Sequence, residues 1–313
     1  MYFENEVKTI FSFIEKNNDI VIFGHKNPDG DCVGSVLGLK YALKEFYPNK
    51  NIFAVGSRPN FLSFIEKSDE VSDEIIKSAL CIMVDLSDLD RVEDQRIRLS
   101  NNIVCFDHHE KSSDFPYPIL RDTSCISATM ILAKVILEKF GSLNEKSATY
   151  FYLGLTTDSN RFQYNSEAET LDIGKKLIEH KANYKWIYEN LYKQDSKDLR
   201  FKAYVYANFK FDGKVAYFIL RKEDYHKLNL NEQEAGCKVN LISSLDNHPL
   251  WAEFCELENG NFRVELRSDG HYNVQKVAVK FNGGGHIPAS GCQISSIDQV
   301  QAVIDELNKA EAL

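Results

Sequence analysis

The sequence predicts an α/β protein: a mainly parallel sheet with helices on both faces, followed by a smaller α+β domain. Two patterns along the 313 residues carry this prediction. Up to residue 192, short apolar runs alternate with segments of helical periodicity, as in successive βαβ units. Beyond residue 202, apolar runs come in pairs around Asp-Gly or Asn-Gly turns, which is typical of antiparallel hairpins. A chain of this length also exceeds what one core usually holds.

The elements of the first domain follow from apolar periodicity. An apolar run between polar or turn residues predicts a buried strand, and apolar residues three and four apart predict the inner face of a helix. The expected strands are residues 19–23, 51–55, 80–84 and 102–106. The expected helices are residues 5–16, 33–46, 127–140, 145–155, 166–180 and 184–192. We expect Gly34 and Gly38 to bring the second of these helices close to the sheet.

The polar stretch 193–202, KQDSKDLRFK, starts without apolar periodicity. We expect a linker there, between a first domain of residues 1–192 and a second of residues 203–313. In the second domain, the sequence predicts hairpins at 208–220 and 251–267, a helix at 273–281 and a strand at 289–294. Between that helix and that strand, three glycines at 283–285 precede His286. Such a run can turn backbone N–H groups toward an anion, although a plain glycine-rich connection explains it equally well.

Composition restricts the class of function. With 43% hydrophobic and 27% charged residues, the chain resembles an ordinary globular protein. No apolar run reaches the ~20 residues that a membrane-spanning helix needs. A net charge of −9 argues against a protein that binds long nucleic acid but is compatible with short anionic substrates. An acidic amino-terminal segment without a secretion signal and seven scattered cysteines without a C-x-x-C pair predict a cytoplasmic protein with free buried thiols.

Acidic and histidine side chains follow three of the expected strands. They are His25, Asp29, Asp31, Asp85, Asp107, His108 and His109. Parallel strands bring their carboxyl ends to one edge of the sheet, where ligands bind, so these residues are expected to meet there. The alternative for the first loop is an ordinary helix cap, which a single Asp would satisfy. Asp158 is either a further acid of this cluster or a cap.

The motifs, in this order and spacing, resemble those of the DHH phosphoesterase superfamily. The matching segments are HKNPDGDCVGS at 25–35, VD at 84–85, DHH at 107–109, TTDS at 156–159 and GGGH at 283–286. The resemblance is to the branch with a DHH-associated second domain, which includes nanoRNA-degrading oligoribonucleases with pAp phosphatase activity and phosphodiesterases of linear dinucleotides. It implies a metal-dependent phosphoesterase with its active site in the cleft between the domains.

The resemblance implies two divalent ions, most simply Mn²⁺, with Mg²⁺ or Co²⁺ as alternatives. The implied ligands are His25 and Asp29 for one ion, Asp31, His108 and Asp158 for the second, and Asp85 for both. Mixed carboxylate and imidazole ligands suit Mn²⁺ better than Mg²⁺, which prefers oxygen, or structural zinc, which favours thiolate. Such a pair of ions would hold a bridging hydroxide for in-line attack at phosphorus.

The resemblance also implies residues that contact the substrate phosphate. His109 would lie beside the phosphate, with Asp107 orienting the histidine pair. From the second domain, Arg267 and His286 would reach the phosphate, and Gly283, Gly284 and Gly285 would line it. Hinge motion at 193–202 would then gate catalysis. Two positions stay outside these roles: Cys32 is expected to be a packing residue, and Arg161 either contacts substrate or faces solvent.

We therefore expect hydrolysis of short oligonucleotides, such as nanoRNA, pApA or pGpG, to 5′-mononucleotides, with pAp or cyclic dinucleotides as further substrates. One alternative is a manganese pyrophosphatase, against which the GGGH segment counts. Another is a non-catalytic nucleotide-binding regulator, which would usually have lost some of the ligands. Long duplex nucleic acid and membranes are not expected partners. A homodimer is expected from the resemblance alone.

Overall fold

The structure is a computed structural model that describes residues 2–110, 115–163, 167–236 and 238–313. The chain divides into Met1–Lys193, here called unit 1, and Gln194–Leu313, here called unit 2. Each unit has its own sheet and its own hydrophobic core. Among the helices of the described residues, none is long and apolar enough to cross a membrane.

Unit 1 is built on a five-stranded sheet in which every strand pair is parallel. The strand order is β2-β1-β3-β4-β5. The strands are β1 Asp19–Phe23, β2 Asn51–Ala54, β3 Leu80–Val84, β4 Ile103–Asp107 and β5 Ile119–Arg121. The sequence predicts the first four but misses β5, because three residues are too few to show a pattern.

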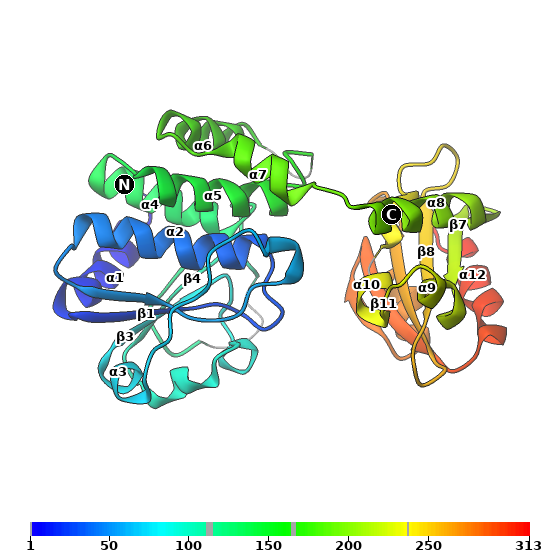
Figure 1. The fold of residues 1–313 in the computed structure, drawn as a ribbon, viewed down its shortest axis with the longest axis horizontal. Coiled ribbons are helices and arrows are strands. Elements are labelled where there is room, and N and C mark those ends of the chain that lie inside the picture. Colours follow the sequence, from blue (N-terminus) through cyan, green and yellow to red (C-terminus); the bar gives the residue numbers. More distant parts are fainter. Residues whose placement is uncertain (1, 111–114, 164–166, 237) are drawn as a thin grey trace. The chain divides into compact units, whose positions relative to one another are not determined.

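Helices cover both faces of this sheet, as predicted (Figure 1). They are α1 Glu4–Lys16, α2 Gly30–Phe46, α3 Asp73–Ser78, α4 Ala128–Phe140 and α5 Glu145–Asp158. Two further helices, α6 Ala168–Glu179 and α7 Tyr184–Leu191, pack on α4 and α5 as an outer layer. Alternate strand residues face opposite sides: Ile20 and Ile22 pack with α1, α2, α4 and α5, whereas Val21 and Phe23 pack on the side of α3. The predicted helix 166–180 begins at a residue outside the described part, and α6 accounts for the rest of it.

The glycines of α2 serve a different contact from the predicted one. A Cβ on Gly34 would lie 2.5 Å from the backbone oxygen of Tyr150, and one on Gly38 would lie 2.4 Å from the ring of Phe151. Both neighbours belong to α5, so the expectation that these glycines approach the sheet is wrong. A Cβ on Gly154 of α5 would in turn lie 2.6 Å from Asp31 Oδ1. The close packing of α2 on α5 therefore places the beginning of α2 beside α5.

Unit 2 contains a six-stranded mixed sheet with the order β10-β11-β9-β8-β7-β6. The strands are β6 Lys210–Asp212, β7 Val215–Leu220, β8 Leu250–Glu256, β9 Phe262–Ser268, β10 Gly284–His286 and β11 Ala289–Ile294. Both predicted hairpins, β6-β7 and β8-β9, are antiparallel. However, β7 and β8 are parallel, whereas the sequence suggests antiparallel pairing for this domain. The reason is the long connection between them, which contains two helices and returns the chain to the same end of the sheet.

In the part of unit 2 that the structure describes, five α-helices cover this second sheet. They are α8 Ser196–Asn208, α9 Lys222–Lys227, α10 Glu232–Ala235, α11 Gln275–Lys280 and α12 Val300–Asn308. The first of them begins inside the stretch 193–202 that the sequence suggests as a linker. A capping box starts it, because Asp195 accepts from the backbone of Asp198 and Asp198 accepts from that of Asp195. Only two of its side chains are buried, so its apolar periodicity is weak.

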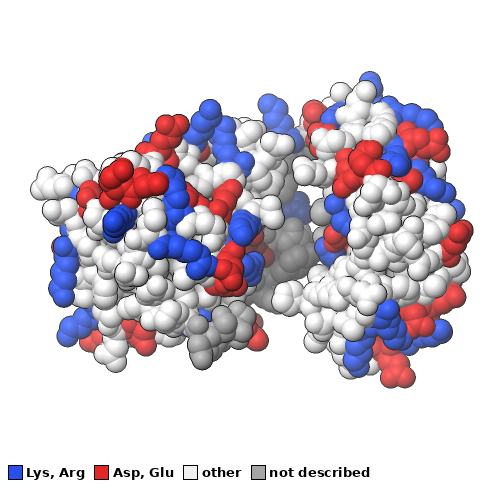
Figure 2. Space-filling view, turned by 90° about the horizontal axis from the view of Figure 1, so that it is seen from below, with Lys and Arg blue, Asp and Glu red and all other residues white. Residues whose placement is uncertain are grey.

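The six described cysteines are free, and Cys292 alone among them is not fully buried. The seventh, Cys237, lies outside the described residues. Charged side chains of both signs alternate over the face drawn in Figure 2, without one large field of a single sign on it. This distribution agrees with an acidic chain that has no extended basic groove on that face for long nucleic acid.

Candidate active site

The site of unit 1 lies at the carboxyl ends of β1, β3 and β4. His25 follows β1, Asp85 follows β3 directly, and His108 follows β4 directly. The parallel order β1-β3-β4 makes these strand ends neighbours, as the sequence predicts. His25 Nε2 lies 3.2 Å from Asp85 Oδ2, and His108 Nε2 lies 3.3 Å from Asp85 Oδ1. One carboxylate therefore joins two imidazoles that are 83 residues apart in sequence, counting from 25 to 108.

Asp85 has the conformation and surroundings of a specialised residue. Its backbone has φ 65°, a left-handed conformation that is uncommon for a residue other than glycine. Its side chain is buried, and its Oδ1 has no hydrogen-bond partner in the described structure. A buried carboxylate oxygen without a partner is costly unless a cation satisfies it. This orphaned oxygen fits a position between metal ions.

Asp29 is both a helix cap and a neighbour of the site. Its Oδ1 accepts from the backbone N–H groups of Asp31 and Cys32, at 3.0 and 2.9 Å, and so caps α2. The same oxygen lies 3.8 Å from His25 Nε2. The two alternatives left open by the sequence are therefore compatible for this residue, because a carboxylate has several lone pairs.

Asp31 is fully buried and held by the beginning of α4. Its Oδ2 accepts from the N–H of Ala128 at 2.6 Å, and its Oδ1 accepts from the N–H and the hydroxyl of Thr129 at 3.0 and 2.6 Å. Sequence reasoning did not find Thr129, although it places the start of a helix beside it. Helix amino termini attract negative charge, and this one fixes the direction of the carboxylate.

His108 completes a second group of ligand atoms. Its Nε2 lies 3.9 Å from Asp31 Oδ2 and 3.6 Å from Asp158 Oδ2. These three residues offer ligand atoms within 4.8 Å of one another, as do Asp85, His108 and His109. Asp158 is the last residue of α5, so the packing of α5 on α2 brings it to the edge of the sheet.

A hydrogen bond at Nδ1 orients the His25 ring so that Nε2 can bind a metal ion. Nδ1 lies 2.9 Å from the backbone oxygen of Lys26, which can only accept a hydrogen bond. A proton on Nδ1 leaves the lone pair of Nε2 pointing toward Asp85. Cys32 is nearby, since its Sγ accepts from the N–H of His25 at 3.3 Å and forms a third group of ligand atoms with His25 and Asp85. Burial raises the pKa of Cys32 to about 11, so its thiol remains protonated at neutral pH.

Asp107 and His109 form a separate pair at the same edge. Asp107 Oδ1 lies 2.8 Å from His109 Nδ1 and accepts from the N–H of His109 at 3.2 Å. Behind it, Arg121 Nε lies 3.7 Å from the other carboxylate oxygen, and its Nη2 donates to Ser87 at 2.6 Å. The sequence prediction missed Arg121 because it lies on the unpredicted strand β5. Since Asp107 engages Nδ1, Nε2 is the remaining ring nitrogen of this side chain, which is 47% exposed.

Electrostatics at the site favour bound cations. Burial and the negative charge of Asp85 raise the pKa of Asp31, and burial with the charges of Asp31 and Asp85 raises the pKa of Asp158 well above its usual range. Burial disfavours charged imidazoles, yet the adjacent Asp85 carboxylate raises the pKa of His25 to about 11, and the carboxylates of Asp85 and Asp31 raise that of His108 to about 9. Without cations, protons must therefore compensate the clustered acids. Divalent ions would compensate the same charge with all ligands deprotonated.

In unit 2, Arg267 and His286 belong to one row of the sheet. Ala289 of β11 pairs with Arg267 on one side and with His286 on the other, so both side chains rise from the same face. Arg267 Nη2 lies 2.9 Å from Glu265 Oε2, and its Nη1 donates to the backbone oxygens of Leu266 and Ser290. The guanidinium is therefore fixed in direction, whereas His286 is exposed.

The glycine run before His286 is an edge strand and not an irregular loop. A Cβ on Gly283 would lie 2.1 Å from the backbone oxygen of Gly291, and one on Gly285 would lie 2.7 Å from that of Ala289. Packing against β11 thus accounts for two of the three glycines. A Cβ on Gly284 would meet nothing within 4 Å, so this position alone is open.

Comparison with known proteins identifies the family. Residues 19–155 match the DHH family, N-terminal domain, and residues 212–312 match the DHHA1 domain. The chain belongs to the DHH family. The resemblance seen in the motifs is confirmed, and the chain is a metal-dependent hydrolase of the DHH phosphoesterase family.

Two curated relatives cover almost the whole chain. The bifunctional oligoribonuclease and PAP phosphatase NrnA of Mycoplasma genitalium is 33% identical over 304 residues, which cover 95% of both chains. Its namesake from Bacillus subtilis is 32% identical over 294 residues, covering 92% of this chain and 93% of the relative.

Solved structures agree with the fold. An exopolyphosphatase-related protein from Bacteroides fragilis has a TM-score of 0.88 and 25% identity, covering 98% of this chain and 96% of its own. PggH, a pGpG-specific phosphodiesterase from Vibrio cholerae, has a TM-score of 0.51 and 14% identity, covering 93% of this chain and 97% of its own. The second likeness shows the fold alone. The predicted combination of an α/β DHH domain with a second, DHH-associated domain is therefore confirmed.

Proposed function

We propose that this chain is a phosphodiesterase that hydrolyses short oligonucleotides to 5′-mononucleotides and also removes a phosphate from pAp. The Asp85 carboxylate carries the proposal, because it lies between the imidazoles of His25 and His108 and its Oδ1 has no hydrogen-bond partner in the described structure. That arrangement suits a phosphoesterase with two metal positions. The names of the curated relatives support the substrate class. Linear dinucleotides such as pApA and pGpG belong to the same class.

The donor set fits two divalent ions, for which we propose Mn²⁺. His25 and Asp29 would hold one ion, Asp31, His108 and Asp158 the other, and Asp85 both. When bound, such ions lower the pKa of water and neutralise charge on phosphate oxygens. Imidazole and carboxylate ligands together favour Mn²⁺, since Mg²⁺ prefers oxygen alone. Cys32 stays a packing residue, because its protonated thiol is a poor ligand.

The remaining residues of the site position the phosphate. His109 would point Nε2 at a non-bridging oxygen while Asp107 accepts from its Nδ1, and as an imidazolium it would donate a hydrogen bond from Nε2. We propose that Arg267 and His286 contact the same phosphate during turnover, with Gly284 allowing close approach of the substrate. Charge that develops on phosphorus oxygens in the transition state would be offset by these donors. Residues 1–192 would then supply the metal ligands and residues 203–313 the additional phosphate contacts.

A product time course tests this function. Purified protein is incubated with Mn²⁺ or with a chelator, together with equal concentrations of pApA, pGpG, a five-nucleotide RNA, pAp, cyclic di-AMP and pyrophosphate. The expected result is manganese-dependent release of mononucleotides from the dinucleotides or the RNA, and of AMP from pAp. Turnover of pyrophosphate alone would instead identify a pyrophosphatase. No turnover of any substrate, with Mn²⁺ bound, would identify a non-catalytic nucleotide-binding protein.

A further inference from the structure

The chain after Asp158 adopts an unusual conformation. Asn160, Arg161 and Phe162 have φ angles of 44°, 62° and 63°, so three consecutive residues other than glycine are left-handed. Each such residue carries an energetic cost and persists only where neighbouring contacts enforce it. Asparagine tolerates this conformation, as the sequence suggested for Asn160, but arginine and phenylalanine do not favour it. The strained backbone of this turn must therefore be stabilised by neighbouring contacts, and its energetic cost requires a functional explanation.

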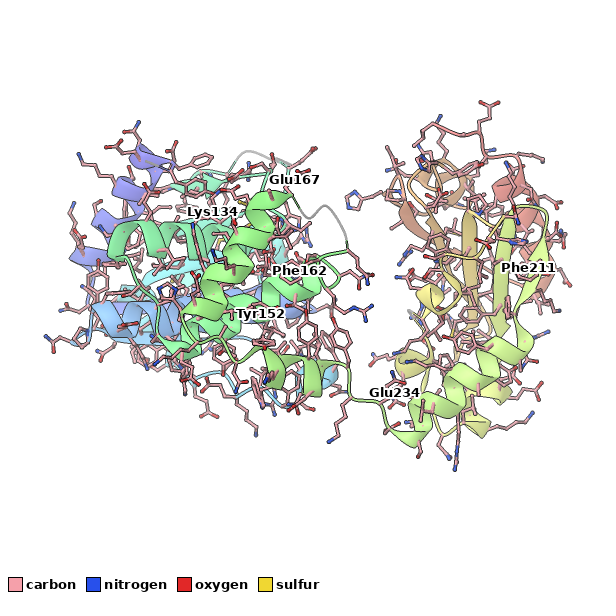
Figure 3. All side chains as sticks on the ribbon, turned by 90° about the horizontal axis from the view of Figure 1, so that it is seen from above. Lys134, Tyr152, Phe162, Glu167, Phe211 and Glu234 are labelled. Carbon is pink, nitrogen blue, oxygen red and sulfur yellow. The ribbon has the colours of Figure 1, made fainter. Side chains whose placement is uncertain are left out.

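Hydrogen bonds and packing hold the turn. The N–H of Arg161 donates to the backbone oxygen of Thr156 at 2.8 Å, and the N–H of Phe162 donates to the hydroxyl of Ser159 at 2.9 Å. The Phe162 ring then packs against Gly174 of α6, where a Cβ would lie 3.1 Å from it. Figure 3 shows Phe162 near Tyr152 of α5, and their ring centroids are 6.1 Å apart.

Phe162 packs against α5 and α6, whereas the neighbouring Arg161 lies at the surface. Its guanidinium carbon lies 4.9 Å from the ring centroid of Tyr192, which follows α7. Tyr192 in turn stacks with Tyr188, at 5.8 Å between centroids and 25° between planes. Arg161 is exposed and Tyr192 is 37% exposed. Among the described residues, no carboxylate pairs with this guanidinium.

A surface cation-π contact does not by itself explain the turn. One exposed contact of this kind contributes less than three left-handed residues cost. The strained turn instead places the guanidinium of Arg161, three residues beyond Asp158, against the ring of Tyr192. The carboxylate of Asp158 lies 3.6 Å from His108. Guanidinium planes and tyrosine rings are the surfaces on which single-stranded bases stack.

We propose that Arg161 and Tyr192 form a nucleobase-stacking subsite beside the metal centre. The ligand is the base of the nucleotide whose phosphate is hydrolysed, so the inference rests on the proposed function. Stacking needs the planar guanidinium, which lysine lacks, whereas attraction of a phosphate needs only positive charge. This difference separates a base-stacking role from a phosphate-binding one.

The first test compares Arg161→Lys and Tyr192→Leu with the parent enzyme on pApA and on the same dinucleotide without its bases. We expect the KM for pApA to rise about tenfold in both variants, with kcat within about twofold and the base-free substrate unaffected. Tyr206→Leu, which changes an exposed tyrosine of α8, is the matched control and keeps the parent KM. An unchanged KM for pApA in both variants would overturn the subsite. An equal rise on the base-free substrate would identify a phosphate contact and overturn it as well.

The second test measures binding without turnover. Calorimetry with Mn²⁺ compares AMP with ribose 5-phosphate, which differ by the base. The parent protein is expected to bind AMP about tenfold more tightly, and Arg161→Lys and Tyr192→Leu are expected to lose that preference. Equal affinities of the parent for both ligands would refute the subsite. If the parent prefers AMP but hydrolyses none of the oligonucleotides, the subsite stands and the proposed function fails. Should Tyr192→Leu melt at a lower temperature, Arg161→Lys decides alone, since it alters only an exposed side chain.

Discussion

The hydroxyl of Thr129 donates to Asp31 Oδ1 over 2.6 Å, across a separation of 98 residues in the chain. This bond and the two N–H donors of α4 hold the Asp31 carboxylate in one direction. Groups that orient metal ligands in this way typically affect metal affinity by about 10- to 100-fold.

Thr129→Val should therefore weaken Mn²⁺ binding by about 10- to 100-fold while preserving the shape of the side chain. The physical reason is that Asp31 would lose one of its three donors, which disfavours the ionised carboxylate. Isothermal titration with Mn²⁺ measures this change. Thr9→Val is the control, because its hydroxyl only donates to the backbone oxygen of Asn5 on the exposed face of α1. Equal Mn²⁺ affinities of the parent and Thr129→Val would show that Thr129 does not position Asp31.

Asp85→Asn should lower kcat/KM by at least about 1000-fold, since a bridging ligand supports several kcal/mol of charge stabilisation. The substitution keeps the size of the side chain and removes its charge, so the fold should persist. Steady-state rates with pApA measure the loss of activity, and circular dichroism checks that the fold persists. Activity within about tenfold of the parent would contradict the bridging role, whereas an unfolded variant would call for Asp85→Glu in its place.

Removal of metal should make stability depend on pH. The folded-state pKa values of Asp31 and Asp158 are raised, so the metal-free folded state binds more protons than the unfolded state above pH 4. Stability of the metal-free chain should accordingly fall as pH rises from 4 through the folded pKa values. At pH 8, Mn²⁺ at 100 times its dissociation constant should restore about 2.7 kcal/mol. Urea titrations with chelator or with Mn²⁺ measure this gain in the free energy of unfolding. Asp85→Asn should lose the stabilisation by Mn²⁺. Coincident curves of the parent with chelator and with Mn²⁺ would refute the prediction.

Arg267→Lys should lower kcat/KM by about 10- to 100-fold without changing Mn²⁺ affinity. The guanidinium is held by Glu265 and two backbone oxygens, and a lysine cannot reproduce that fixed planar geometry. Steady-state kinetics with pApA and calorimetry with Mn²⁺ are the measurements. Lys276→Arg, on an exposed side of α11, serves as a control for altered basic groups in the same unit. Loss of Mn²⁺ affinity in Arg267→Lys would place its effect at the metal ligands and not at the phosphate.

Glu253→Gln should stabilise unit 2 at alkaline pH. Burial raises the pKa of Glu253 from 4.5 to about 7, and its Oε1 has no hydrogen-bond partner in the described structure. Because the folded pKa is raised, the folded state loses stability between pH 4.5 and 7, by up to about 3 kcal/mol for this shift. The variant should therefore match the parent at pH 4.5 and exceed it at pH 8.

Urea titrations at pH 4.5, 6, 7 and 8 measure this difference. A Trp186→Phe background leaves Trp251 of β8 as the single tryptophan, so its fluorescence reports on unit 2. Glu223→Gln, at an exposed position of α9, should show no such change with pH. A constant difference between Glu253→Gln and the parent at every pH would mean that folding does not raise the pKa of Glu253.

Local sequence patterns account for much of the site. The continuous apolar runs of β1, β3 and β4 predict buried parallel strands, and the order of such strands brings their carboxyl ends together. His25, Asp85 and His108 could therefore be placed at one edge from sequence alone. Their residue types also indicate a metal centre, because a strand end buried at a sheet edge has no structural need for so many charges.

The tertiary structure decided what supports those residues. Thr129 and Arg121 come from α4 and β5, and no periodicity in their own segments points to Asp31 or Asp107. The packing partner of Gly34 is likewise a helix that lies more than 100 residues later in the chain. Local patterns report which side chains are buried and in which secondary structure. Hydrogen-bond partners, the parallel pairing of β7 with β8 and the display of Arg161 over Tyr192 arise only when distant segments pack, because their distances depend on the whole core.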